Sequence, residues 1–199
     1  MVVTHIDYDA DRWFRIPAGE LLKDVYEGSL TSWAIDVTAL VLAGEQDVQS
    51  EEFDRFVGAF LQVAAIELDD LPVVDAFMFV PNAYDGIQLV HVLEWDVEPE
   101  IPPDEIGDLL DTLAMLHDPT AVEAPIREVT TSKGMGSGVR VLRYVLDDGA
   151  LIACIGYTFY RPRSRTILEL RASSLELGGF MRMLEALDEF VDGIREEAG

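Results

Sequence analysis

The last third of the chain carries four apolar segments separated by short polar turns, and this spacing constrains the fold more than any other feature. The segments span residues 126–131, 139–146, 151–160 and 166–172. Asp148-Gly149 lies between the second and third segments. This dipeptide favours a tight hairpin, because both central residues of a type I′ turn need positive φ. The sequence therefore predicts an antiparallel meander of four strands.

The third of these segments (LIACIGYTFY, residues 151–160) is apolar at nearly every position. A strand with one solvated face alternates apolar and polar residues, whereas a strand covered on both faces does not. We therefore expect this strand near the centre of the sheet, with other elements packed on both of its sides.

Helical spacing of apolar residues predicts helices before the meander. Ser50 is a suitable N-cap for a helix whose apolar positions run from Phe53 to Ala64, and Pro103 fits the first turn of another. Residues 31–44 fit either a helix or a strand. Their Ala and Leu content, with Gly44 as a stop, favours the helix.

The chain is expected to close with an amphipathic helix. Ser173 and Glu176 have the spacing of a capping box, and the apolar stripe that follows reaches Ile194. Two further strands are predicted over 76–80 and 87–97. The sum is an α+β fold, in which an antiparallel sheet of about six to seven strands packs with about four helices. Nothing divides the chain, so residues 1–199 are expected to form a single domain.

This arrangement resembles the Mog1/PsbP-like α/β sandwich in the order of its elements over residues 70–196. The shared features are a helix, a strand meander and a C-terminal amphipathic helix. That fold occurs in photosystem accessory subunits, a small-GTPase-binding protein and bacterial lipoproteins. The resemblance therefore implies binding rather than catalysis.

Negative charge is concentrated in the first two thirds of the chain. Residues 1–126 contain 27 acidic and four basic side chains, and the whole chain has a net charge of −24. Such a surface repels phosphate backbones and anionic lipid. The sequence therefore predicts no nucleic-acid binding and no membrane association. The start of the chain lacks the apolar run of a secretory signal, so we expect a cytoplasmic protein.

No motif indicates a metal, a cofactor or a catalytic residue. Cys154 is the only cysteine, and the three histidines do not have zinc-ligand spacing. Asp7, Asp9 and Asp11 alternate as in a calcium loop, but the glycine and glutamate that such a loop needs are missing. We expect neither a metal nor a bound cofactor.

Two other candidate sites are better explained by structure. The glycine-rich stretch 133–138 (KGMGSG) is followed by a strand-like segment rather than the helix that a phosphate loop needs, and it is expected to form a hairpin turn. His91 shares a predicted strand with Glu94 and Asp96. Side chains alternate along a strand, so His91 points away from the two acids. A packed histidine is expected there, and His117 is expected to end a helix, where the dipole favours a cation.

Arg161, Arg163 and Arg165 form the only dense basic run, in a turn between the last two predicted strands. Alternate residues project together in such a turn, and guanidinium groups grip carboxylates in a bidentate manner. These three residues are therefore predicted to bind a protein partner or the acidic face of a second copy.

Three functions follow from these observations. The first is a non-catalytic module that binds a protein or itself. The second is an enzyme that uses carboxylates and a divalent ion, with His91 or His117 in its pocket. The third is a carrier with an apolar pocket between the sheet and the helices.

Overall fold

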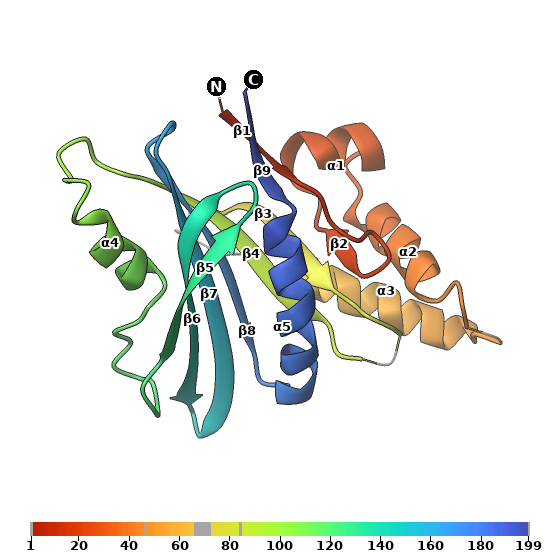
Figure 1. Cartoon of the computed structure of the whole chain (residues 1–199). Helices are drawn as coiled ribbons and strands as arrows, with labels where there is room; N and C mark the ends of the chain where they lie inside the picture. The colour runs from red at the N-terminus through yellow and green to blue at the C-terminus, as the bar shows by residue number, and fades with distance from the viewer. Residues whose placement is uncertain (1, 46, 66–72, 84, 199) are drawn as a thin grey trace.

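The computed structural model describes residues 2–45, 47–65, 73–83 and 85–198 (Figure 1). Its centre is a seven-stranded antiparallel sheet with the order β2-β3-β4-β8-β7-β6-β5. The strands are β2 (Trp13–Arg15), β3 (Val73–Phe79), β4 (Gln88–Asp96), β5 (Ile126–Ser132), β6 (Gly136–Asp147), β7 (Ala150–Arg161) and β8 (Thr166–Ser174). The predicted α+β class and the four-strand meander are confirmed.

The hairpin between β6 and β7 has the predicted turn. Asp148 has a φ of 46° and Gly149 a φ of 82°, as a type I′ turn requires. The third strand of the meander, β7, is flanked by β8 and β6 and is buried on both faces over most of its length. Its position is the one that its continuous apolar sequence predicts.

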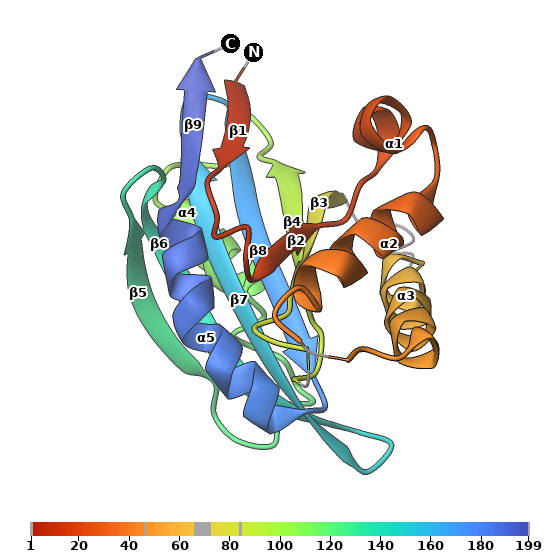
Figure 2. The same ribbon diagram turned by 90° about the vertical axis from the view of Figure 1, so that its right-hand side faces the viewer.

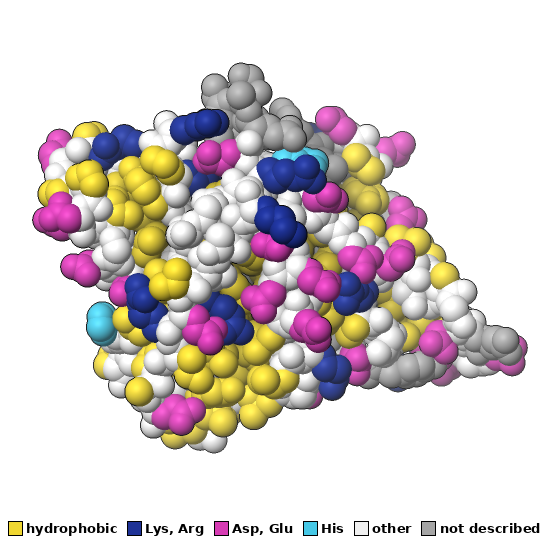
Figure 3. Space-filling model, in the orientation of Figure 1, with side chains coloured by type: hydrophobic (Ala, Val, Ile, Leu, Met, Phe, Trp, Pro, Cys, Tyr) yellow, Lys and Arg dark blue, Asp and Glu magenta, His cyan; other side chains and the backbone are white. Residues whose placement is uncertain are grey.

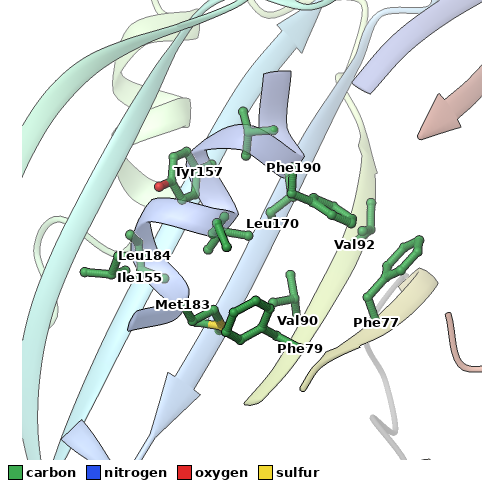
Figure 4. Packing of buried hydrophobic residues seen from close by; sticks show 14 of the residues in the cluster. Phe77, Phe79, Val90, Val92, Ile155, Tyr157, Leu170, Met183, Leu184 and Phe190 are labelled. Atoms are coloured by element: carbon green, nitrogen blue, oxygen red, sulfur yellow. The ribbon is translucent and has the colours of Figure 1, made fainter. Parts of the chain in front are cut away.

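One face of the sheet is covered by the last helix, α5 (Leu177–Asp192). Figure 4 shows Met183, Leu184 and Phe190 of α5 packed toward the sheet, and Tyr157 and Leu170 belong to the same buried cluster. Phe190 also stacks on Trp13, with 4.6 Å between ring centroids, and its ring meets the edge of Phe77 at 4.9 Å. This cluster forms the main core.

Two separate groups of helices cover the opposite face (Figure 2). Near β2 and β3, α2 (Leu30–Val41) and α3 (Ser50–Ala64) bury Trp33 and Phe60 against the sheet. Near β6 and β7, α4 (Ile106–Leu113) packs through Ile106 and Leu110. A further short helix, α1 (Gly19–Tyr26), precedes α2. The middle of this face lies between the two groups.

The structure corrects the predicted start of the last helix. Ser173 belongs to β8, so the N-cap of α5 is Glu176, whose carboxylate accepts a hydrogen bond from the backbone N–H of Gly179. A capping role for Glu176 itself is favourable because its charge meets the positive end of the helix.

The predicted end of that helix also changes. The helix stops at Asp192, and Ile194 begins β9 (Ile194–Ala198), which pairs with β1 (Val2–Ile6) in a two-stranded ribbon. Gly193 permits this turn, because a Cβ there would lie 1.9 Å from the carbonyl oxygen of Asp7. Among the described residues, no helix is long and apolar enough to cross a bilayer.

We predict that Phe190→Ala lowers the free energy of unfolding by about 4 kcal/mol, because it removes an aromatic ring from a fully packed cluster. Met181→Ala on the exposed side of α5 is the matched control, with an expected change within about 0.5 kcal/mol. Urea denaturation followed by tryptophan fluorescence measures both. Similar losses in the two variants would contradict the assignment of α5 as the core-forming helix.

Candidate binding pocket

A pocket of about 560 Å³ opens on the sheet face between the two groups of helices. Its lining is mostly apolar and includes Val63 of α3, Leu89 and Leu93 of β4, and Ile152 of β7. A second pocket of about 390 Å³ shares Val63, Leu89 and His91 with the first. The two pockets therefore adjoin at these three residues, close to the C-terminal end of α3.

The alternation of side chains along β4 creates this lining. Even-numbered Val90 and Val92 face α5 and are completely buried, whereas Leu89, His91 and Leu93 project to the opposite face. There, α3 ends at Ala64 and α4 covers β6 and β7, so neither helix fills the middle of the sheet. The pocket is the space left between them.

His91 and Arg171 line the floor of the pocket, and Arg171 belongs to a compact polar group with Glu169 and Trp95, which do not line it. His91 lies directly opposite Arg171 in the β4–β8 pairing. Arg171 donates to the carboxylate of Glu169, with Nε and Nη2 at 2.8 and 2.7 Å from Oε1. The indole Nε1 of Trp95 donates to the other oxygen, Oε2, at 2.8 Å. Glu169 is almost completely buried; Arg171 compensates its charge, and Trp95 hydrogen-bonds its second oxygen.

The protonation of this group follows from its burial. Burial, together with the nearby Arg171 cation, lowers the pKa of His91 to about 4. His91 is therefore a neutral imidazole at pH 7, with one nitrogen that donates and one that accepts. Burial also raises the pKa of Glu169, while Arg171 opposes the rise. The floor thus offers hydrogen bonds without a net charge.

The structure separates the three arginines of the predicted binding run. In contrast to the expectation of a shared exposed cluster, Arg161 is only 2% exposed. It pairs with Glu94 and Glu196, and its Nη1 donates to Thr4 Oγ1 at 2.6 Å. Arg163 and Arg165 are exposed at the turn, and Arg165 also donates to the carbonyl of Glu98 at 2.9 Å. Binding through Arg163 and Arg165 stays a prediction.

The other candidate residues do not converge. Glu94 lies on the α5 face with Arg161, away from His91, and His117 is exposed at the end of the α4 region. Asp7 and Asp9 form ion pairs with Arg195 and Arg12. Within the described ranges, no group of three or more His, Cys, Asp or Glu side chains is arranged to hold a metal ion.

Sequence reasoning missed the role of Glu169 and Arg171. Both interrupt the apolar segment that forms β8, and both point to the pocket face. Two opposite charges in an otherwise buried strand are a usable signal, because buried charges are paired. Their meeting with His91 depends on the β4–β8 register, which joins residues about 80 positions apart.

We predict that Arg161→Ser lowers the free energy of unfolding by about 3 kcal/mol, because it leaves partly buried carboxylates without a counter-ion. Arg163→Ser, two residues away on the exposed turn, should change it by no more than about 0.5 kcal/mol. Thermal and urea denaturation of the two variants provide the comparison. Equal effects would show that Arg161 does not hold the terminal ribbon.

We also predict a pH dependence that arises from His91. Its pKa is about 4 in the folded chain and near 6.5 when unfolded, so acid favours the unfolded state, which takes up the proton first. Between pH 7 and pH 5 this linkage removes about 2 kcal/mol of stability. The wild type should therefore lose about that much more than His91→Gln over this interval. Parallel pH profiles of the two proteins would contradict a partly buried, neutral His91.

No protein-family model matches the sequence, and no curated protein matches it. Among solved structures, the fold is similar to that of LpqN of Mycobacterium tuberculosis, a protein involved in cell envelope biogenesis. The TM-score is 0.57, the alignment covers 100% of this chain and 85% of the LpqN chain, and the sequence identity is 11%. At this identity the likeness establishes a shared fold.

Proposed function

We propose that this protein is a non-catalytic binding protein that holds a small, uncharged, mostly apolar molecule in the pocket beside α3. The observation that carries the proposal is the composition of the pocket, in which apolar walls surround a polar floor of zero net charge. Ligand sites in proteins commonly have this form, with apolar walls that supply affinity and a few polar groups that fix orientation.

The charge of the ligand follows from the state of Arg171. Among the described residues that line the pocket, Arg171 is the one cationic side chain, and Glu169 already neutralises it. The chain around it carries a net charge of −24, which repels an approaching anion. An uncharged ligand does not need an unpaired cation and is not repelled by the net negative charge. Its hydrogen-bonding group would be oriented by the His91 imidazole and the free edge of the Arg171 guanidinium.

This proposal corresponds to the carrier among the functions expected from the sequence. Nothing among the described residues indicates catalysis, and the Arg171 guanidinium is held by its contacts with Glu169. The fold is shared with LpqN, a protein involved in cell envelope biogenesis. The proposal therefore includes a site of action at the envelope as an alternative to the predicted cytoplasmic location.

We predict that Nile red, which is apolar and uncharged, binds the protein with a 1:1 saturable fluorescence increase. Leu89→Trp fills the space between the two pockets and should weaken binding at least about tenfold, a loss of about 1.4 kcal/mol. Leu40→Trp, at an exposed position of α2, is the control and should leave affinity unchanged.

A second dye tests whether the pocket prefers an uncharged ligand. Anilinonaphthalene sulfonate, an anionic apolar dye, should bind the pocket at least about tenfold more weakly than Nile red at low ionic strength. Absence of saturable Nile red binding, or equal losses in both tryptophan variants, would reject the pocket. If the anionic dye binds more tightly than Nile red, and Leu89→Trp abolishes that binding, the pocket is a binding site but its ligand is not uncharged.

A further inference from the structure

The strand β5 ends the sheet with an open edge. Its inner edge pairs with β6, and no strand within the described residues pairs with its outer edge. Five of its first six residues are exposed, among them Val129, the most exposed large apolar side chain of the described chain at 71%, and Ile126 at 51%. Figure 2 shows β5 at the margin of the molecule with its outer side free.

Such an edge is a template for another strand, because its outward N–H and C=O groups lack partners. Natural edge strands are commonly protected by an unpaired charge, a proline or a very short length. The opposite edge strand, β2, has only three residues. In contrast, β5 has seven residues and no proline, and it places valine at its middle.

The charges of β5 are already compensated within the chain. Arg127 Nε lies 2.7 Å from Asp111 Oδ1 of α4, and Glu128 forms an ion pair with Arg140 of β6. The strand is therefore electrically neutral in a chain whose net charge is −24. Acidic side chains are spread across the face shown in Figure 3, and Asp188 and Asp192 of α5 lie beside β5, so the balance of charge is confined to the strand itself.

We infer that β5 pairs with β5 of a second copy in an antiparallel arrangement whose two-fold axis passes through Val129. Directly opposite residues of an antiparallel pair lie on the same face of the sheet, so the numbers of each pair must sum to an even value. An axis at Glu128 or at Arg127 would place like charges opposite each other, which is destabilising.

The axis at Val129 avoids this conflict. It places Val129 against its own copy, Arg127 against Thr131, and Glu128 against Thr130. The apolar side chain that is most exposed in one copy is then covered by the same residue of the other. The pairing joins two sheets into one, and a β-branched pair at its centre is favourable in a sheet.

Cross-linking tests this register. In a Cys154→Ala background, Val129→Cys is expected to form an intermolecular disulfide under mild oxidation, because the two Cα atoms at the axis lie about 5 Å apart. Thr131→Cys is the matched control on the same face and strand. Its two copies would lie roughly 13 Å apart along the paired strands, beyond disulfide reach, and only background cross-linking is expected.

The response to salt tests the same proposal in the unmodified protein. Two copies that each carry a charge of −24 repel at long range, so a dimer held by neutral β5 edges strengthens as salt screens that repulsion. Light scattering across a dilution series at about 0.02 and 0.5 M NaCl measures the shift, and Val129→Lys is expected to be monomeric at both. A monomer at every concentration, a dimer that salt weakens, or equal cross-linking at 129 and 131 would overturn the proposal.

Discussion

The burial of α5 against the sheet is the interaction on which the rest of the structure depends. Its apolar stripe supplies Phe180, Met183, Leu187 and Phe190, all of which are almost completely buried. These residues reach strands from both halves of the sheet, so a single helix joins β3 and β4 to the later meander. Because one face is sealed in this way, the opposite face does not need a continuous cover.

The pocket follows from the different cover of the two sheet faces. Apolar burial contributes about 25 cal/mol per Å², and the α5 face supplies most of the large apolar contacts that the fold requires. Among the described residues, the other face is covered at its two ends by separate groups of helices, and no helix covers its centre around His91. A polar group is tolerated there because Glu169, Arg171 and Trp95 satisfy one another, whereas an unpaired charge at the same place would be strongly destabilising.

Local patterns in the sequence predict most of the helices and strands but few of the tertiary contacts between them. The two apolar segments within 139–160 and the Asp148-Gly149 turn between them are sufficient for the β6–β7 hairpin, because both effects act within a few residues. Ile194 has the correct spacing for the helical stripe and yet begins a strand, because Gly193 allows a close approach to Asp7 that no helical pattern encodes. The expectation that Arg161 lies in an exposed turn was also wrong because it used local sequence alone. The partners that bury Arg161 come from β4 and β9, and neither strand is near it in sequence.

The terminal ribbon has a mechanical consequence. Val2 pairs with Ala198, so both ends of the described chain leave the molecule at the same place and point the same way (Figure 1). A force that pulls these ends apart acts across the rungs of the ribbon and opens them one at a time, rather than shearing all of them together. The third rung joins Thr4 and Glu196, and Arg161 contacts both residues of that rung from the end of β7. Under tension, the contacts of the buried Arg161 guanidinium with Thr4 and Glu196 must therefore break before the force reaches α5 and the core.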